Sequence, residues 1–453
     1  MSTRLQWVGS FSRRLPTAIR LAFGLALMVF VSTLLLMLPW VGAERPLQFN
    51  EALFTATSAL TVTGLSIITP GSDLSLIGQI TLLVLIQVGG VGYMVVSVIV
   101  FRILGRSISF ADRLALRDSF GLLDLNAIVE LIRRVLFAVF SLEFIGALLL
   151  WLHWRADLGN ERAILFAVFH SVSAFCNAGF DLFVGTPGFT GIPSDNFSLS
   201  VIAILILIGG LGIPVVADLI FLFVRRSHNL SLHSRLTLIV TAFLVVLGSI
   251  GLFVAETQPG ATMATLPNGR ALALSTFQSI SARTAGLSAL DNFYDLSASS
   301  QLLKISLMFI GTAPASMGGG ITTGTFTVLI LALWAFARGR EAPRIFGRSL
   351  GAAAVRRASA VLTISLLVVI SVTWILLITH PGAPLDKVLF EVISAFATCG
   401  LSLGYTSNLS FFGQFMIGLV MFWGRLGALS IILVLAQLAP PHLIVYPEEQ
   451  ILI

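Results

Sequence analysis

Four short segments of the sequence share a pattern of small residues that ends in glycine. Each segment starts at a phenylalanine, has a Ser-Ala pair four and five residues later, and reaches its glycine nine or ten residues after the phenylalanine. Glycine takes positive φ angles without steric cost, so the chain can reverse there and turn main-chain oxygens toward one side. A ring of carbonyl oxygens can replace the water shell of a metal ion. The pattern therefore predicts a site for a bare monovalent cation, and its glycines are Gly64, Gly179, Gly286 and Gly400.

The candidate ligands are the main-chain oxygens of the four residues that end at each glycine, because the side chains differ between segments. An alternative is that these glycines only let helices pack closely, as small residues do in membranes. Four glycines in register, each after a segment too short to span a bilayer, favour the cation site, since irregular backbone at membrane depth needs a polar cavity. We name these residues the glycine loops: Thr61, Val62, Thr63 and Gly64; Cys176, Asn177, Ala178 and Gly179; Arg283, Thr284, Ala285 and Gly286; Ala397, Thr398, Cys399 and Gly400.

Membrane helices must position these loops, because the composition excludes a soluble protein. Hydrophobic residues make up 57% of the 453 residues and charged residues only 11%, and the mean hydropathy is +0.98. Ordinary globular chains contain about 25% charged residues. Eight apolar runs are long enough to cross about 30 Å of hydrocarbon. Shorter runs, 18–40, 135–154, 236–255 and 359–379, alternate with longer ones, 76–104, 199–224, 302–337 and 411–438, which must tilt, bend or break.

The four glycines recur at intervals of 115, 107 and 114 residues, close to one quarter of the chain. The sequence therefore predicts four copies of a unit made of a helix, a re-entrant segment, a glycine loop and a second helix. Every copy begins and ends on the same side of the membrane, so the copies are parallel and surround one axis, unlike inverted repeats. The expected fold is an all-α integral membrane protein with eight transmembrane helices. The expected boundaries are the copies 18–105, 135–224, 236–337 and 359–438, the linkers 106–134, 225–235 and 338–358, and the end segments 1–17 and 439–453.

The short segments before the glycine loops, of about ten to fourteen residues, are too short as helices to cross the bilayer. They should enter from outside and point their partially negative C-terminal ends at the middle of the membrane, where a cation is stabilised. Four such segments around one axis predict a passage through the protein.

Arginines set the expected orientation. Nineteen of the 27 Lys and Arg residues lie before residue 21 or in the stretches 102–134, 225–235 and 338–357, which the positive-inside rule assigns to the cytoplasm together with both chain ends. Twelve carboxylates lie on the opposite side. These carboxylates either are simply the outer counterpart of the arginine-rich cytoplasmic side or form a vestibule that concentrates cations. The arginines flank apolar runs and few aromatic residues lie among them, so nucleic acid is not an expected partner.

Catalytic chemistry is not expected. None of the six histidines has a metal-ligand spacing, and the chain has neither a Ser, His and Asp arrangement nor a phosphate-binding loop, so no cofactor is implied. The two cysteines, Cys176 and Cys399, are far apart in the sequence and are expected to be free thiols.

Each longer apolar run also contains a glycine cluster near its middle, ending at Gly92, Gly212, Gly311 or Gly427, where a helix is weak. In the third run a proline and consecutive glycines must break the helix. A flexible, uncharged segment below the glycine loops could lie across the passage and move, which would make it a gate; the alternative is a passive kink. The candidate gating residues are Gly311, Thr312, Ala313, Pro314, Ala315, Ser316, Met317, Gly318, Gly319, Gly320, Ile321, Thr322, Thr323 and Gly324.

Ionised residues inside membrane helices indicate functional positions. Arg425 is at the depth of the broken segment and is expected to contact it, as a positive barrier, as a hydrogen-bond donor to carbonyls, or in a structural pair. We expect Arg283 to point away from the axis and brace its loop through carbonyls or an outer carboxylate such as Asp291. Glu143 could pair with an arginine or a backbone donor, and Asp218 could form an interfacial ion pair with the arginines at 225 and 226.

These residues resemble the superfamily of potassium transporters that includes the bacterial Ktr and Trk systems and the plant high-affinity transporters. The resemblance covers nearly the whole chain. The loop sequences around the four glycines, the 453-residue length and the end at Tyr446-Pro-Glu-Glu449 are most similar to the membrane subunit of Ktr systems. The resemblance implies one pore like that of a potassium channel, with the four glycines as filter positions that prefer potassium to sodium. It also implies that Gly311–Gly324 is the gating loop and that Arg425 is its charged neighbour.

The resemblance further implies a homodimer in a bacterial plasma membrane, surrounded by lipids and resting on a cytoplasmic ring of nucleotide-binding regulatory subunits. Potassium is the expected transported ion, and whether sodium stimulates transport stays open. The expected function is potassium uptake driven by the membrane potential, which is worth about 2.3 kcal/mol per charge per 100 mV. The alternative is a secondary carrier coupled to sodium or protons, in which Glu143 or Asp218 would be essential.

Overall fold

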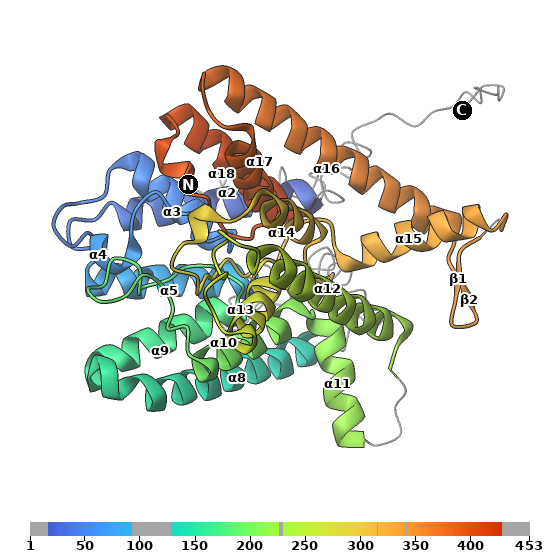
Figure 1. The fold of residues 1–453 in the computed structure, drawn as a ribbon, viewed down its shortest axis with the longest axis horizontal. Helices are drawn as coiled ribbons and strands as arrows, with labels where there is room; N and C mark the ends of the chain where they lie inside the picture. Colours follow the sequence, from blue (N-terminus) through green and yellow to red (C-terminus); the bar gives the residue numbers. More distant parts are fainter. Residues whose placement is uncertain (1–16, 93–127, 226–229, 315, 341, 428–453) are drawn as a thin grey trace, which may run out of the picture.

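The computed structural model describes residues 17–92, 128–225, 230–314, 316–340 and 342–427 (Figure 1). This part of the chain is mainly helical, with one two-stranded hairpin. Helices are expected for an apolar chain in a membrane, because a helix pairs its main-chain polar groups internally. The predicted helical membrane fold is therefore confirmed.

The first helix of each copy is long and apolar. These helices are α2 (Thr17–Leu36), α8 (Ile128–Leu158), α12 (Leu232–Glu256) and α16 (Ala352–Thr379). The stretches Leu136–Leu158, Leu232–Glu256 and Ala352–Thr379 are long and apolar enough to cross a membrane. All four helices overlap the shorter apolar runs, and α8 begins before the predicted 135–154 run and ends after it.

The re-entrant segments form four short helices. They are α3 (Phe49–Leu60), α9 (Asn160–Phe175), α13 (Asn268–Ser281) and α17 (Leu385–Phe396). Their lengths of 12 to 16 residues correspond to about 18–24 Å at 1.5 Å per residue, which is less than the hydrocarbon thickness. Pro267 and Pro384 come directly before α13 and α17, because proline does not fit inside a helix. The last five residues of each short helix are buried.

The second helix of each copy starts at a side-chain cap and stops at a glycine. These helices are α5 (Leu76–Val91), α10 (Asn196–Gly210), α14 (Ala298–Ile310) and α18 (Phe411–Leu426). Their caps accept hydrogen bonds from the first turn, and are Ser75, Asp195, Ser297 and Ser410. Positive φ follows each helix, at Gly92 (85°), Gly212 (82°), Gly311 (62°) and Gly427 (76°). The predicted weak points of the long runs are therefore the sites where the helices end.

After two of these breaks the structure describes a further helix. One is α11 (Ile213–Arg225), and the stretch Pro214–Ile220 within it is bent by 108° relative to α10. The other is α15 (Thr323–Ala337), which follows the 311–324 segment. The shorter elements are α4 (Pro70–Asp73), η1 (Phe293–Asp295), η2 (Thr406–Asn408), β1 (Arg344–Ile345) and β2 (Arg348–Ser349). The two strands pair antiparallel, Arg344 with Ser349 and Ile345 with Arg348. This hairpin lies in the 338–358 linker and was not predicted.

The four copies close into a ring. Within each copy the first helix packs on the short helix, as α2 does on α3 and α8 on α9. Between copies the second helix packs on the short helix of the next copy: α5 on α9, α10 on α13, and α14 on α17. The last contact, α18 on α3, joins the fourth copy to the first. The short helices are therefore surrounded by longer ones, as Figure 1 shows for α13 near the middle of the molecule.

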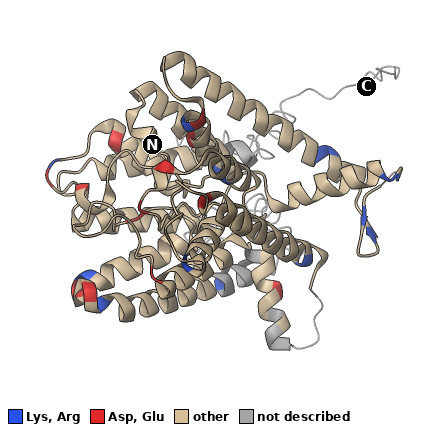
Figure 2. Ribbon diagram, in the orientation of Figure 1, with Lys and Arg blue, Asp and Glu red and all other residues tan. Residues whose placement is uncertain are grey.

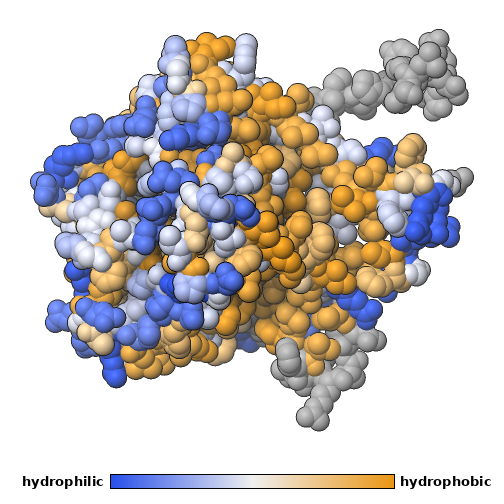
Figure 3. Space-filling view, viewed as in Figure 1, coloured by the Kyte–Doolittle hydropathy of each residue, from blue (hydrophilic) through white to orange (hydrophobic). Residues whose placement is uncertain are grey.

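Charge and hydropathy are distributed as a membrane protein requires. The carboxylates of the described residues lie mainly in the left half of Figure 2, and arginines mark the hairpin at the right. Between these ends, Figure 3 shows a broad hydrophobic surface. Large apolar side chains of the described residues, such as Phe23, Phe137, Phe243 and Trp374, are more than half exposed. Such a surface is stable against lipid but not against water.

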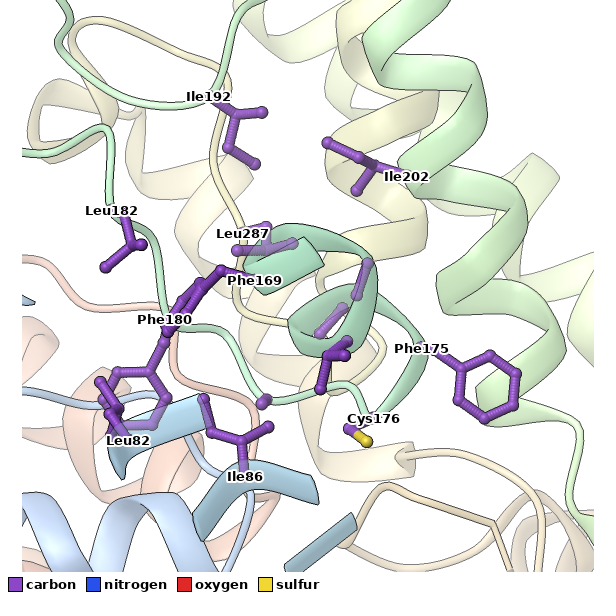
Figure 4. Close-up of a cluster of buried hydrophobic side chains, with 14 of the residues drawn as sticks. Leu82, Ile86, Phe169, Phe175, Cys176, Phe180, Leu182, Ile192, Ile202 and Leu287 are labelled. Atoms are coloured by element: carbon purple, nitrogen blue, oxygen red, sulfur yellow. The ribbon is translucent and has the colours of Figure 1, made fainter. Parts of the chain in front are cut away.

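The buried core surrounds the short helices. Figure 4 shows Leu82 and Ile86 of α5, Phe169 of α9 and Ile202 of α10 gathered around the end of α9, where Cys176 begins the second glycine loop. The thiols of both cysteines are free and buried, as predicted. This packing fixes the position of the glycine loop at the end of the helix.

Candidate functional site

The four loop glycines, one from each copy, meet at a common centre. A Cβ atom placed on Gly64 would lie 2.6 Å from the Cα of Gly179, and one on Gly286 would lie 3.0 Å from the same Cα. A Cβ atom on Gly400 would lie 3.0 Å from the Cα of Gly64. Residues that are more than 300 positions apart in the sequence are thus in van der Waals contact. At Gly64, Gly286 and Gly400 a Cβ would lie within 2.4 Å of a main-chain oxygen, so a side chain does not fit there.

A carbonyl oxygen from each copy faces the glycine of a neighbouring copy. A Cβ on Gly64 would lie 2.4 Å from the Ala178 oxygen, and a Cβ on Gly179 would lie 3.2 Å from the Ala285 oxygen. In the other two copies, a Cβ on Gly286 would lie 2.1 Å from the Cys399 oxygen, and a Cβ on Gly400 would lie 2.2 Å from the Thr63 oxygen. The sequence of contacts runs from the first copy to the second, third and fourth and back to the first. Each oxygen belongs to the residue directly before a loop glycine. The four contacts between oxygens and glycines therefore close a ring around the centre.

The loop backbone takes an uncommon conformation that repeats in all four copies. The residue two positions before each glycine has positive φ: Val62 (55°), Asn177 (55°), Thr284 (69°) and Thr398 (48°). Side chains disfavour this region, and it persists only where the surrounding structure imposes it, often at functional sites. The glycines themselves have φ between 71° and 92°. The same strained geometry in four copies indicates a shared function for the loops.

A serine near the end of each short helix holds the loop that follows it. The hydroxyls of Ser58 and Ser394 accept hydrogen bonds from the amides of Gly64 and Gly400, at 3.0 and 3.1 Å. In the other two copies the hydroxyl donates instead to the carbonyl after the glycine: Ser173 to Phe180 at 2.8 Å, and Ser281 to Leu287 at 2.5 Å. The sequence pattern contained these serines but gave no indication of their partners.

Arg283 points away from the centre of the ring, as expected. Its guanidinium donates to the carbonyl oxygens of Thr241 in α12, at 3.3 Å, and of Gly311, at 3.0 Å. The suggested outer carboxylate has another partner, because Asp291 accepts a hydrogen bond of 2.6 Å from Thr190. Arg283 therefore connects its loop to the start of the 311–324 segment.

The 311–324 segment lies directly against the loops. A Cβ on Gly318 would lie 1.9 Å from the Thr284 hydroxyl, and one on Gly319 would lie 2.7 Å from the Thr398 hydroxyl. The amide of Ala313 donates to Gly210 of α10 at 3.1 Å, and that of Met317 donates to Gly209 at 3.4 Å.

Further hydrogen bonds shape the same segment. Thr312 and Ser316 share a hydrogen bond of 2.8 Å between their hydroxyls. The amides of Ile321 and Thr323 donate to Phe309 and Thr312, while Thr322 caps α15 and Gly324 packs against Pro314. Gly320 has a positive φ of 78°. Ala315, the remaining predicted member, lies outside the described residues.

Arg425 contacts the broken segment, as predicted. Its guanidinium donates to the carbonyl oxygens of Met317 and of Gly89, and it also lies 3.3 Å from the Gly90 oxygen. Gly89 and Gly90 belong to the last turn of α5, whose carbonyls have no partner within the helix. One guanidinium thus joins α18, α5 and the 311–324 segment. Of the three roles suggested for Arg425, these contacts favour hydrogen bonding to carbonyls.

The two other intramembrane carboxylates have different surroundings. For Glu143 of α8 an arginine or a backbone donor was suggested as the partner, and among the described residues its carboxyl bonds to neither. It accepts a hydrogen bond of 3.0 Å from the Gln87 amide and one of 3.8 Å from the Cys176 thiol. Asp218 accepts from the Ser231 amide, at 3.1 Å, and from the Ser234 hydroxyl, at 2.6 Å. Residue 226, one of its suggested partners, lies outside the described ranges.

The ring can bind a cation only through main-chain oxygens and hydroxyls. Among the described residues no group of three or more His, Cys, Asp or Glu could hold a metal ion. The main-chain oxygens that face the loop glycines are those of Thr63, Ala178, Ala285 and Cys399. Neutral oxygens suit a weakly hydrated monovalent ion better than a divalent one, because removing water from a divalent ion costs more free energy than neutral oxygens can offset.

Comparisons with known proteins agree with this architecture. Residues 22–445 match the TrkH family, whose members are described as cation transport proteins. The Ktr system potassium uptake protein B of Vibrio alginolyticus is 35% identical over 93% of this chain and 91% of its own length. The potassium/sodium uptake protein NtpJ of Enterococcus hirae is 32% identical over 97% of this chain and 98% of its own. The structure of the potassium transporter TrkH from Vibrio parahaemolyticus superposes with a TM-score of 0.71 at 18% identity, covering 93% of this chain and 84% of that one. The chain belongs to the TrkH family of cation transport proteins.

Proposed function

We propose that this protein is the membrane subunit of a Ktr-type system and conducts potassium ions into the cell. Ions enter from the outer side, lose water to the carbonyl oxygens of the glycine loops, and pass the 311–324 segment to reach the cytoplasm. In this proposal the glycine loops are the selectivity filter and the 311–324 segment, with Arg425, is the gate. The choice of ion is supported by relatives that are named as potassium uptake proteins and that this chain matches over nearly their whole length.

The closed ring of contacts between four carbonyl oxygens and the loop glycines carries this proposal. A dehydrated ion needs oxygens from all sides, and only four loops at one centre can provide them. The ring also accounts for the strained φ angles at Val62, Asn177, Thr284 and Thr398, which close packing of glycines alone would not require. The ends of four short helices point at the same centre, where their partial negative charge favours a cation.

The contacts of the 311–324 segment support its assignment as the gate. Two of its glycines, Gly318 and Gly319, touch the side chains of Thr284 and Thr398 in the glycine loops. Within the described residues, main-chain and hydroxyl hydrogen bonds and the guanidinium groups of Arg283 and Arg425 hold it in place. Such contacts can break and reform at modest cost, as a moving element needs.

The proposed assembly has components beyond this chain. We propose a homodimer in a bacterial plasma membrane, with both termini in the cytoplasm, and a ring of nucleotide-binding regulatory subunits below it. The exposed β1–β2 hairpin, with Arg344 and Arg348, provides basic residues for such a partner. The name of a relative as a component of a Ktr system is consistent with more than one subunit.

A carrier coupled to protons or sodium is the second candidate function. It is favoured by one observation, the buried Glu143 carboxyl in contact with Cys176 of a glycine loop. The pore remains the better proposal, because Glu143 has neutral hydrogen-bond partners and lies behind the loop. Strictly coupled, saturable transport that Glu143→Gln or Asp218→Asn abolishes would favour the carrier.

Uptake by potassium-starved bacteria that lack their own potassium transporters tests the proposal. Cells producing this chain, with Ktr regulatory subunits, should regain growth and take up potassium in preference to sodium. Gly64→Ser and Gly286→Ser should reduce this preference, because the added side chain displaces the Ala178 and Cys399 carbonyls. Gly269→Ala is the matched control, since a Cβ there meets no atom within 4 Å. Unchanged preference in both serine variants would contradict the filter assignment.

A further inference from the structure

Each short helix places a buried polar residue directly after its phenylalanine. The four residues at this position are Thr55, His170, Gln278 and Glu391, and all are at most 1% exposed. Their side chains differ in size and charge, so no single chemistry explains a polar residue in each copy. Buried polar groups need hydrogen-bond partners. The partners show what the position does.

In three copies the partner is the residue two positions after the loop glycine. His170 Nε2 lies 2.9 Å from an Asp181 carboxylate oxygen. Gln278 Nε2 donates to the Ser288 hydroxyl at 3.0 Å. In the third pair, the Ser402 hydroxyl donates to Glu391 Oε1 at 2.6 Å. The positions repeat although the residue types do not, which indicates that the connection itself is required.

Additional hydrogen bonds strengthen the Glu391–Ser402 pair. Glu391 also accepts from the amides of Leu403 and Tyr405, at 3.0 and 3.2 Å, and from the Thr406 hydroxyl at 2.5 Å. One carboxylate thus holds the whole turn that follows Gly400.

In the third copy a cation supports the connection. Lys304 of α14 is fully buried and donates to Gln278 Oε1 at 2.7 Å. Its Nζ also lies 4.7 Å from the centre of the Phe293 ring, a cation–π contact. The Gln278 amide is therefore held at both ends, by Lys304 and by Ser288.

The first copy lacks this connection. The Thr55 hydroxyl is buried and has no hydrogen-bond partner among the described residues. Its counterpart after the glycine, Ser66, donates instead to the Ile68 carbonyl of its own loop, at 2.7 Å. Threonine is shorter than histidine, glutamine and glutamate, so the missing contact follows from side-chain length.

We propose that His170–Asp181, Gln278–Ser288 and Glu391–Ser402 are three clamps that hold the outer rim of the proposed filter against its short helices. This inference goes beyond the proposed function and rests on the glycine loops being the filter. The clamps position the chain immediately outside the ring and thereby limit how far its carbonyls can move apart. The first copy, without a clamp, is the most compliant quarter of the rim.

Serine-to-alanine variants at equivalent positions test the clamps. Ser288→Ala and Ser402→Ala remove one clamp partner each, whereas Ser66→Ala, at the same position of the first copy, removes none. A hydrogen bond to a charged group is lost in Ser402→Ala, so the potassium-to-sodium uptake ratio should fall by about tenfold. Ser288→Ala, which loses a neutral hydrogen bond, should reduce the ratio by about threefold. Ser402→Thr keeps the hydroxyl and should restore the ratio.

The control and a second measurement separate this inference from the proposed function. Ser66→Ala should leave the uptake ratio unchanged, and an equal loss in Ser66→Ala and Ser402→Ala at matched membrane levels would overturn the proposal. Hydrogen exchange of the purified protein should become faster in Ser402→Ala at the amides of Leu403 and Tyr405, which donate to Glu391. In Ser66→Ala faster exchange is expected only at the Ile68 amide, which donates to the Ser66 hydroxyl itself. If the chain transported no cation, exchange would still report on the clamps, and unaltered exchange at Leu403 and Tyr405 would refute them.

Discussion

The guanidinium of Arg425 in α18 donates a hydrogen bond to the main-chain oxygen of Met317, 108 residues earlier, in the segment between α14 and α15. The same guanidinium binds the end of α5 through Gly89 and Gly90. A planar donor with several N–H groups suits this bridge, because the carbonyls approach it from different elements. Arg425 therefore fastens the proposed gate to two helices of neighbouring copies.

Replacing Arg425 by glutamine should increase potassium flux. The variant loses the bridge between the 311–324 segment and α5, and a hydrogen bond from a charged group contributes about 1.5–3 kcal/mol, enough for about a tenfold change in gate opening. The preference for potassium should stay the same, because the glycine loops are untouched. Initial rates of potassium and sodium uptake at matched protein levels measure both quantities.

Arg425→Lys distinguishes a hydrogen-bonding role from a purely electrostatic barrier. Lysine keeps the positive charge but is a point donor that does not span Met317 and the α5 carbonyls together. If Arg425 acts as a bridge, the lysine variant should resemble glutamine and conduct faster than the wild type. If the lysine variant had wild-type flux while the glutamine variant conducted faster, the electrostatic-barrier role would be favoured instead.

Gly318→Ala should also open the passage, by a steric route. The new Cβ would lie 1.9 Å from the Thr284 hydroxyl and 2.5 Å from that of Thr312, so the segment would no longer fit against the glycine loop. We expect higher potassium flux at a similar ion preference. Gly351→Ala, directly before α16, is the control, because a Cβ there meets no atom within 4 Å and its φ of −69° suits alanine. Lower flux in Gly318→Ala would count against the gate assignment.

The four loop glycines should not be equally sensitive to alanine. A Cβ at Gly286 or Gly400 would lie 2.1 or 2.2 Å from a carbonyl oxygen of the ring, whereas the nearest atoms to a Cβ at Gly179 are 3.2 Å away. All four positions have positive φ, which costs an alanine about 1 kcal/mol. Gly179→Ala should therefore retain more of the preference for potassium than Gly286→Ala or Gly400→Ala. Competition between potassium and sodium uptake ranks the variants, and the reverse order would contradict the geometry of the ring.

The sequence was sufficient to predict the centre of the molecule because glycine has a conformational meaning of its own. Four glycines in register predicted four converging loops, and the clusters ending at Gly92, Gly212, Gly311 and Gly427 predicted where the long helices are interrupted. At each of these positions the local residue preference agrees with the final fold. Hydropathy likewise predicted the helices, because a membrane leaves few alternatives for an apolar chain.

Contacts between copies could not be predicted in the same way. Valine and threonine disfavour positive φ, so nothing in their type indicates the conformation of Val62, Thr284 and Thr398; neighbouring copies impose it. The α5 partners of Arg425 are 335 and 336 residues away in the sequence. The partners suggested for Glu143 differ from those found among the described residues, because an intramembrane carboxylate suggests a cation, whereas an amide and a thiol are the groups that packing brings to it.

The last prediction concerns the glycines that let the second helices touch the short ones. A Cβ on Gly209 of α10 would lie 1.9 Å from the carbonyl oxygen of Phe175, which is the last residue of α9. A Cβ on Gly424 of α18 would lie 2.1 Å from the carbonyl oxygen of Phe396, the last residue of α17. Both obstacles are main-chain atoms, which cannot turn away as a side chain can. Overpacking of this kind costs about 1–3 kcal/mol, so Gly209→Ala and Gly424→Ala should lower the thermal unfolding temperature of the purified protein.

Gly251 of α12 provides the matched comparison for these variants. A Cβ there would meet only the side chain of Leu303, at 2.5 Å, which can change rotamer, and alanine favours helix over glycine by about 1 kcal/mol. Gly251→Ala should therefore unfold at or above the wild-type temperature. Because Phe175 directly precedes the second glycine loop, Gly209→Ala should also reduce the preference for potassium, whereas Gly251→Ala should not. Equal stability of the two variants would show that the close contact at Gly209 is not what positions the end of α9.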